Sequence, residues 1–225
     1  MGIAVEVISP KDFLARVQPS LEAQDWDGLL HTVRKHWTPH EVKTLLTCNH
    51  ADARKVAALA IGLVGKEDAL EPLSRVLHDG DRMVVEMAEH AMWQIWFRGG
   101  SEHANAHLAR GAEALNRHDI DDALKHLEKA IRLSPDFWEA YNQRAIAHYL
   151  SERYQESIDD CRRVLRAQPL HFGAWAGLGH SYLAVGDVPA ALQAYEKAIA
   201  INPHLECIAE LVQELRGKGG SNGDP

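Results

Sequence analysis

The hydrophobic positions from Trp175 to Pro203 follow a helical period in two successive runs. Apolar residues recur there three, four or seven positions apart, a spacing that gathers them on one face of a helix. Gly186-Asp187 interrupts the pattern, because glycine accepts the backbone geometry of a tight turn. Asn202-Pro203 ends it, since proline disfavours helical geometry in the residue before it. The pattern predicts two antiparallel helices, over about residues 174–185 and 189–201.

Small residues mark the place where these two helices are expected to cross. Gly179 and Ala191 occupy that place, and small side chains let two helix axes approach closely. Neither helix can bury its apolar face alone. Each pair therefore requires a neighbouring pair against which to stack.

The same unit recurs along the chain with a period of 34 residues, which separates Pro135 from Pro169 and Pro169 from Pro203. The small-residue positions persist in all three copies, whereas the aromatic positions are lost toward the N-terminus. In the second copy, Arg144 and Cys161 stand where the third copy has leucine and tyrosine. This period and its small, aromatic and proline positions are typical of one repeat family.

On these residues, the segment from about Ala104 to Pro203 resembles three tetratricopeptide repeats. The expected domain is 101–216, with repeats at 104–137, 138–171 and 172–205 and a capping helix to 216. That last helix keeps a one-sided apolar stripe after the third repeat. The tail, 217–225, lacks apolar residues and is predicted to be disordered.

The first 50 residues predict helices that cover one end of a stack. Ser9-Pro10 has the character of an N-cap followed by proline in the first turn. Pro19 or Ser20 is expected to interrupt that first helix. Thr38 and Glu41 form a capping box around Pro39, so another helix should begin there.

Residues 51–100 show a weaker repeat. Two apolar stretches, 53–65 and 84–96, align at a shift of 31 residues, so that Ala57 matches Ala88. Their paired alanines and the Asp-Gly-Asp break between them are similar to HEAT-like helix pairs. The whole chain is thus predicted to be an all-α, right-handed helical-repeat solenoid. Because the linker at 98–101 is short, we expect the two arrays to touch, with Ser101 as a helix N-cap.

Composition narrows the functional class. The chain has 225 residues, 46% of them hydrophobic and 25% charged, as in an ordinary soluble protein. A net charge of −8 argues against a nucleic-acid or anionic-membrane partner, which would need a basic surface. The three cysteines are irregularly spaced and suggest no disulfide framework. Without a signal peptide or an apolar span, the expected location is the cytoplasm.

Candidate chemistry is sparse, and no catalytic, cofactor or metal site is predicted. His36 and His40, like His103 and His107, have the i, i+4 spacing of a ligand pair, but structural histidine is the preferred interpretation. Two paired carboxylates, Asp121-Asp122 and Asp159-Asp160, are expected on solvated faces. Cys161 occupies a core position of its repeat, where an apolar setting makes a thiol unreactive. No nucleotide-binding or hydrolase fingerprint is present.

The resemblance implies a peptide-binding groove along the first helix of each repeat. Asparagine and glutamine in this groove offer both a donor and an acceptor to a peptide backbone. The groove is expected to be neutral, with small residues beside amides. Its predicted lining residues are Asn105, Leu108, Ala112, Glu139, Asn142, Gln143, Ile146, Tyr149, Ala176 and His180.

The family resemblance implies a non-catalytic adaptor or scaffold that binds a protein or peptide partner. Two alternatives remain open: a chromophore-lyase-like HEAT protein, and a structural module that self-associates end to end. Some tetratricopeptide domains clamp the terminal carboxylate of a chaperone tail with lysines, asparagines and an arginine. The matching positions here are Leu108, Ala112, Gln143, Gly173 and Gly177, which lack charge, so an internal segment is the expected ligand.

Overall fold

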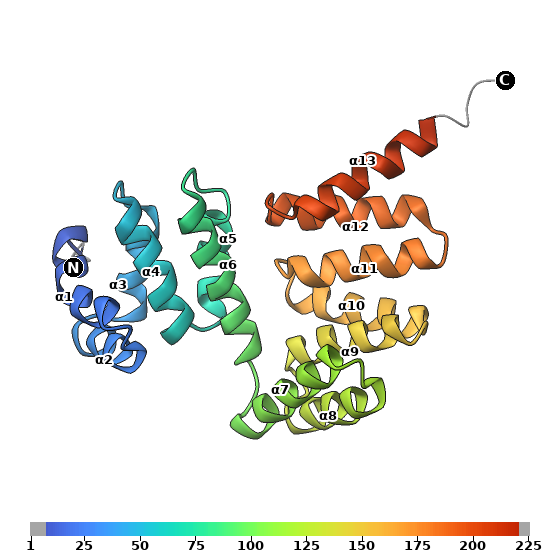
Figure 1. Cartoon of the computed structure of the whole chain (residues 1–225), viewed down its shortest axis with the longest axis horizontal. Helices are drawn as coiled ribbons and strands as arrows, with labels where there is room; N and C mark the ends of the chain where they lie inside the picture. Colours follow the sequence, from blue (N-terminus) through green and yellow to red (C-terminus); the bar gives the residue numbers. More distant parts are fainter. Residues whose placement is uncertain (1–7, 221–225) are drawn as a thin grey trace, which may run out of the picture. The chain divides into compact units, whose positions relative to one another are not determined.

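The chain, whose residues 8–220 are described by a computed structural model, folds into two compact units. One unit ends at Trp96 and the other begins at Phe97, a few residues before the boundary expected from the sequence. All regular structure in the described residues is helical, with thirteen α-helices and two short 3-10 helices (Figure 1). The predicted all-α class is confirmed.

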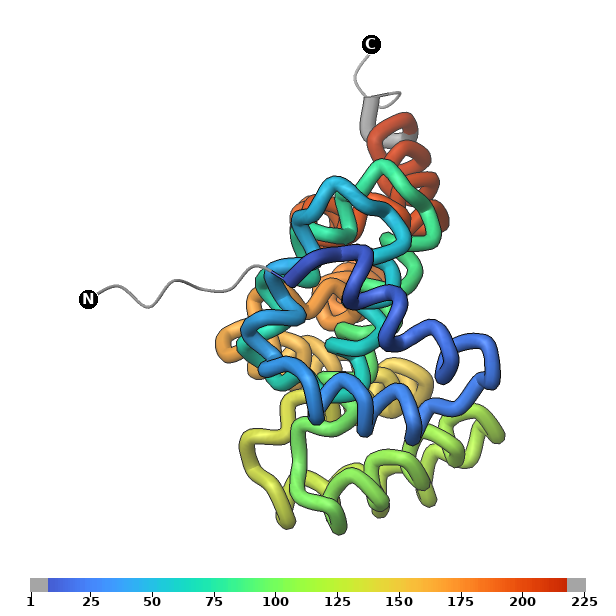
Figure 2. The backbone as a smooth tube through the Cα atoms, turned by 90° about the vertical axis from the view of Figure 1, so that its left-hand side faces the viewer, coloured from blue at the N-terminus to red at the C-terminus, as the bar shows by residue number. Residues whose placement is uncertain are grey.

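The first unit opens with a helical hairpin made of α1 (Pro10–Glu22) and α2 (Trp26–His36). Figure 2 shows these two helices, in blue, doubling back on one another. The Ser9 hydroxyl accepts the Asp12 N–H at the start of α1, and the Asp25 carboxylate accepts the Gly28 N–H at the start of α2. Both helices therefore begin at side chains that satisfy backbone donors.

The expected break of the first helix at Pro19 or Ser20 is wrong, because α1 continues through both residues to Glu22. Pro19 is exposed, so water can bond the carbonyl that loses its helical partner. Phe13 and Val17 lie one turn apart on the opposite side and are fully buried. Tertiary packing of that face outweighs the local preference of the proline.

The rest of the first unit alternates long and short helices. The capping box predicted at Thr38 and Glu41 is present. At Gly62, an added Cβ would lie 3.1 Å from the Cα of Ala91, so two long helices approach closely there. The elements are α3 (Pro39–Thr44), a 3-10 turn (Leu45–Thr47), α4 (Ala51–Val64), a second 3-10 turn (Glu67–Ala69), α5 (Leu70–Val76) and α6 (Arg82–Phe97).

An ion pair joins α4 to the loop before α6. Arg54 donates to both carboxylate oxygens of Asp79, at 2.7 and 2.9 Å, and to the Cys48 carbonyl at 2.9 Å. Hydrogen bonding to Arg54 lowers the pKa of the Asp79 carboxyl. The pair fixes the Asp79-Gly80-Asp81 turn that the sequence places between the two apolar stretches.

The second unit consists of three helical hairpins and a final helix, stacked in chain order (Figure 1). Within it, α8 packs on α9, and α10 packs on α11. The Ser101 hydroxyl accepts the Ala104 N–H and caps the first of these helices, as expected. The helices are α7 (Glu102–Asn116), α8 (Ile120–Leu133), α9 (Trp138–Leu150), α10 (Tyr154–Ala167), α11 (Phe172–Ala184), α12 (Val188–Ile201) and α13 (Glu206–Gly220).

The final helix extends further than expected. It ends at Gly220, so residues 217–220 belong to a helix rather than to the predicted disordered tail. Positions 221–225, the rest of that predicted tail, lie outside the described residues.

One backbone feature recurs in the turn of every hairpin. His118, Glu152 and Gly186 all have positive φ angles, of 58°, 59° and 82°, and successive members are 34 residues apart. Residues with a Cβ atom rarely adopt this backbone conformation, which glycine accepts readily. The following N–H bonds back to the helix carbonyl in each turn, over 2.8–2.9 Å. The sequence signals the turn clearly only where glycine occupies it.

Whether the two units stabilise one another can be tested by thermal unfolding. If the two units share an interface, a fragment that begins at Phe97, the first residue of the second unit, should melt at a lower temperature than the whole chain, because it loses stabilising contacts. Calorimetry of the fragment and of the full chain would measure this. Equal melting temperatures would show that the units unfold independently.

Candidate functional site

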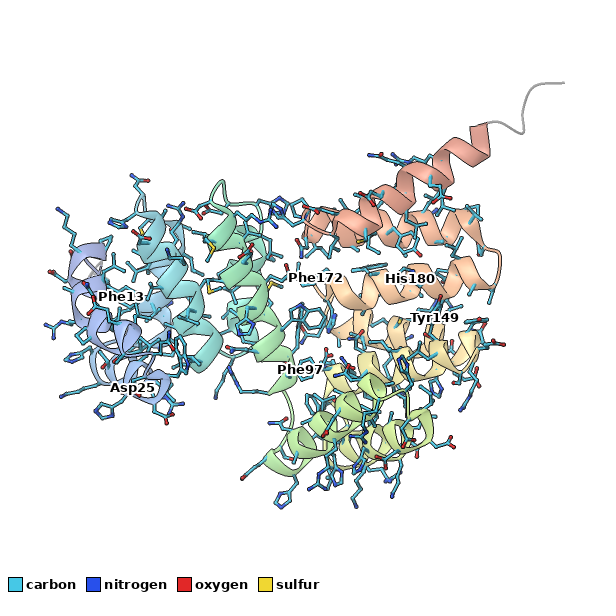
Figure 3. The ribbon with its side chains drawn as sticks, viewed as in Figure 1. Phe13, Asp25, Phe97, Tyr149, Phe172 and His180 are labelled. Atoms are coloured by element: carbon cyan, nitrogen blue, oxygen red, sulfur yellow. The ribbon has the colours of Figure 1, made fainter. Side chains whose placement is uncertain are left out.

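A pocket opens between α9, α10 and α11 in the second unit. It has a volume of about 140 Å³ and is called the α9–α11 pocket below. Four of the predicted groove residues come together there; two of them, Tyr149 and His180, are labelled in Figure 3. The lining residues are Asn142, Ala145, Ile146, Tyr149, Ser157, Cys161, Gly177 and His180.

The walls of this pocket are mainly apolar. Ile146 and Tyr149, one turn apart on α9, are 38% and 36% exposed, so two large apolar side chains face solvent beside it. Cys161 is buried, and burial raises the pKa of its thiol to about 12. The thiol is therefore protonated at neutral pH and acts as a small apolar wall, as the sequence predicts.

His180 forms the polar edge of the pocket. Its Nδ1 lies 2.8 Å from the Tyr195 hydroxyl, and the rings of His180 and Tyr149 have centroids 6.2 Å apart. Burial lowers the pKa of the imidazole, which is thus uncharged at neutral pH. The pocket carries no full charge on its lining side chains and suits an apolar group of the size of a benzene ring.

Glu139 does not line an open groove as predicted; it is a buried carboxylate at the start of α9, only 1% exposed. The Asn142 amide nitrogen donates to it over 3.2 Å and the Gln143 amide nitrogen over 2.7 Å. Both amide nitrogens are thus turned toward Glu139. Their carbonyl oxygens remain as acceptors, so the two amides are less versatile than the sequence suggests.

His171 completes the bonding of this carboxylate. Its Nδ1 accepts the Ala174 N–H at 3.1 Å and caps α11, while its Nε2 lies 2.8 Å from Glu139 Oε2. A carboxylate only accepts, so Nε2 carries the proton and the ring is neutral. Both side chains are 0% exposed. The pair links α9 to the beginning of α11, and it is joined to the pocket through Asn142, which lines the pocket and donates to Glu139.

The four other predicted groove residues occupy different places. Leu108 is fully buried in the apolar core of the first hairpin, against which Phe97 also packs. Asn105 accepts the Gly100 N–H at 3.0 Å and so fixes the entry to α7. Ala176 packs against the core between α11 and the last two helices. Ala112 is partly buried on α7.

The expectation that Asp159-Asp160 lies on a solvated face is wrong for Asp160. Arg144 donates to both oxygens of Asp160 at 2.7 Å, and the Asp160 side chain is 9% exposed. The Arg144 and Arg163 guanidinium groups lie 5.2 and 5.1 Å from the centre of the Tyr141 ring. The sequence signal for this ion pair is Arg144 itself, because it stands where the third repeat has leucine and a buried cation requires a partner.

The two i, i+4 histidine pairs differ in their surroundings. His36 lies on α2 and His40 on α3. His107 instead faces His126 of α8, with their Nδ1 atoms 2.9 Å apart. Burial, and then the charge of His126, lower the pKa of His107. Within residues 8–220, no group of three or more His, Cys, Asp or Glu side chains could hold a metal ion.

Three stacked hairpins with a 34-residue period, and an uncharged pocket between the second and the third, define a helical-repeat domain. Comparison with known families agrees with this class. Residues 108–170 and residues 173–205 each match a family described as tetratricopeptide repeat. The second unit is built of tetratricopeptide repeats.

Relatives with known sequences share these repeats. A TPR repeat-containing protein of Rhizobium etli is 31% identical over 127 residues, which are 56% of this chain and 62% of that protein. Anaphase-promoting complex subunit 3 of Schizosaccharomyces pombe is 33% identical over 42% of this chain and 15% of its own length. The chain thus spans less than two thirds of both relatives.

Two solved structures show the same fold. The first TPR of Spaghetti (RPAP3) bound to an HSP90 peptide superposes with a TM-score of 0.52 at 16% identity, over 54% of this chain and 98% of that one. The Sgt2 TPR domain from Aspergillus fumigatus has a TM-score of 0.52 at 20% identity, over 56% and 87%. Among the described helices of this chain, none is long and apolar enough to cross a membrane.

Proposed function

We propose that this protein is a non-catalytic adaptor that binds an internal segment of a partner protein along the first helices of its tetratricopeptide repeats. The α9–α11 pocket accepts one apolar side chain of that segment. The Asn142 and Gln143 carbonyl oxygens accept hydrogen bonds from donors beside it. In this proposal the first unit is a HEAT-like section, and the repeats of the second unit form a right-handed solenoid.

The observation that carries this proposal is the exposure of Ile146 and Tyr149 beside an uncharged pocket. Large apolar side chains that face solvent around a cavity are typical of binding sites. The solved RPAP3 domain of the same fold is bound to an HSP90 peptide, which supports a peptide as the kind of ligand. The Glu139–His171 pair joins α9 to α11, the helices that carry most of the pocket lining.

The test selects linear peptides, displayed within a carrier protein, for binding to the wild-type chain. The affinity of each selected peptide is then measured for the wild-type chain and for Ile146→Glu. A glutamate would place an unpaired charge against the apolar anchor. We expect selected peptides to bind Ile146→Glu at least tenfold more weakly, about 1.4 kcal/mol. Leu133→Glu is the matched control, because Leu133 is a 41% exposed apolar residue at the end of α8. Equal losses in the two variants would contradict the proposal.

The terminal carboxylate of a ligand should not contribute to binding. Of the five positions for a carboxylate clamp, Leu108 is buried, and Gly173 and Gly177 carry no side chain. A carboxylate placed there would lose its water without gaining a cation. For a selected peptide made with a free and with an amidated C-terminus, we expect affinities that differ by less than tenfold. A greater loss on amidation, measured by calorimetry, would reveal a clamp.

The hydrogen bond to Asn142 should contribute modestly. Its amide nitrogen is held by Glu139, so only the carbonyl oxygen remains for a ligand. Asn142→Ala should weaken a selected peptide by about 0.5–1.5 kcal/mol, the net value of one neutral hydrogen bond. Titration of the same peptide into both proteins measures the difference. Unchanged affinity would place the ligand away from α9.

A further inference from the structure

A second, differently charged surface lies on α10, α11 and α12. An open pocket of about 530 Å³ there is lined by Trp175 and Tyr182 of α11, together with Lys197 of α12. Another, of about 350 Å³, lies along α10 beside Arg162, Arg163 and Arg166. The two pockets meet at one contact, since Arg162 Nε donates to the Tyr182 hydroxyl at 3.0 Å. Together they form what we call the α10–α12 surface.

This surface is separate from the α9–α11 pocket. Gly177 and His180 line the α9–α11 pocket, whereas Trp175, Leu178 and Tyr182 line the other. Residues two apart on a helix project about 200° from one another. The two sites therefore open from opposite faces of α11.

The repeat itself produces the α10–α12 surface. Arg163 and Lys197 occupy the same register position in the second and third repeats, and Lys129 occupies it in the first. All three are exposed. The linings of the two pockets together hold four cations and three carboxylates, so this surface carries a small local positive charge on a chain with a net charge of −8. The cations are Arg162, Arg163, Arg166 and Lys197, and the carboxylates are Asp159, Asp160 and Glu196.

The cations of this surface remain available to a partner. Arg162, Arg163, Arg166 and Lys197 form no ion pair within the described part of the chain. The three carboxylates that line the pockets are already bonded: Asp160 to Arg144, Asp159 to the Gln155 amide, and Glu196 to Arg216. Trp175 is fixed by its own indole N–H, which donates to the Pro169 carbonyl at 2.9 Å. Fixed aromatic rings beside arginines are the composition of binding hot spots.

We infer that the α10–α12 surface binds an acidic segment of a partner protein that carries an apolar or aromatic residue. Its carboxylates pair with Arg162, Arg163 and Arg166, and its apolar residue lies on Trp175 and Tyr182. The apolar floor and the negative charge of the whole chain favour a peptide over a nucleic acid. A partner could then occupy both faces of α11 at once, or two partners could bind together.

The test uses a fluorescein-labelled peptide of about twelve residues, rich in glutamate with leucine and phenylalanine, and fluorescence anisotropy at low salt. We expect the wild-type chain to bind it, and Arg163→Glu/Arg166→Glu to bind it at least about tenfold more weakly, because like charges then face each other. Arg34→Glu/Lys35→Glu in α2 makes the same charge change at exposed residues that line neither pocket of this surface and should alter affinity less than twofold. Thermal melts check that the variants are folded.

Three results would overturn the inference. They are no binding of the acidic peptide, equal losses of affinity in the two double variants, or binding of an oligouridylate that is tighter than that of the peptide and equally weakened by Arg163→Glu/Arg166→Glu. The Ile146→Glu variant separates the two sites. It should leave the acidic peptide bound within twofold, so that failure of the α9–α11 proposal would not affect this one. A tenfold loss in Ile146→Glu would place the acidic peptide in the other pocket and contradict the inference.

Discussion

Replacing His171 by alanine is expected to lower the free energy of unfolding of the second unit by about 3–5 kcal/mol. The imidazole and the Glu139 carboxylate are both 0% exposed, so removal of the ring leaves a buried negative charge with fewer donors. It also leaves the Ala174 N–H without its cap, for which Nδ1 is the acceptor. Each loss alone is substantial, and they occur together.

Urea denaturation of the full chain, followed by circular dichroism, would measure this effect. His204→Ala is a matched control, because His204 is an exposed histidine shortly before α13 and should change stability by less than about 0.5 kcal/mol. The double variant Glu139→Ala/His171→Ala removes the buried charge as well, and should be less unstable than His171→Ala alone. A loss below 1 kcal/mol for His171→Ala would mean that water reaches the pair.

The helical repeats could be predicted because their signals are local. Gly186, Pro203 and the apolar face of α11 act within a few residues of their own positions, and the expected helices 174–185 and 189–201 differ from α11 and α12 by at most two residues at each end. The helix break predicted at Pro19 is wrong, because the effect of a proline depends on whether the carbonyl that loses its helical partner is exposed to water. That exposure is a property of the folded unit rather than of the local sequence.

The candidate site could be predicted only in part. Ile146, Tyr149 and His180 reach the pocket because each follows the register of its own repeat. Glu139 has the same register, but it turns inward because His171, 32 residues away, offers a donor. Leu108 is drawn into the core of the first hairpin, since a leucine gains more from burial than the asparagine or alanine at the same position of the other two repeats. Such choices depend on partners that sequence spacing does not identify.

Replacing Ala191 by leucine is the second large effect that we expect, a loss of about 1–3 kcal/mol from overpacking. Ala191 is fully buried in a cluster with Tyr195, Ile208 and Val212. The crossing beside it is tight: a Cβ added to Gly179 would lie 2.4 Å from the Tyr195 ring, which is itself fully buried. The ring cannot withdraw into solvent, so additional methyl groups must displace α12 or α13.

Gln193→Leu tests whether the effect belongs to that position. Gln193 is exposed on the same helix, and leucine favours helix slightly more than glutamine does, so this variant should stay within about 0.5 kcal/mol of the wild type. Calorimetric melts of both variants would separate the two outcomes. Equal stability would mean that α11 and α12 cross elsewhere than at Gly179 and Ala191, and that the register assigned to all three repeats is displaced.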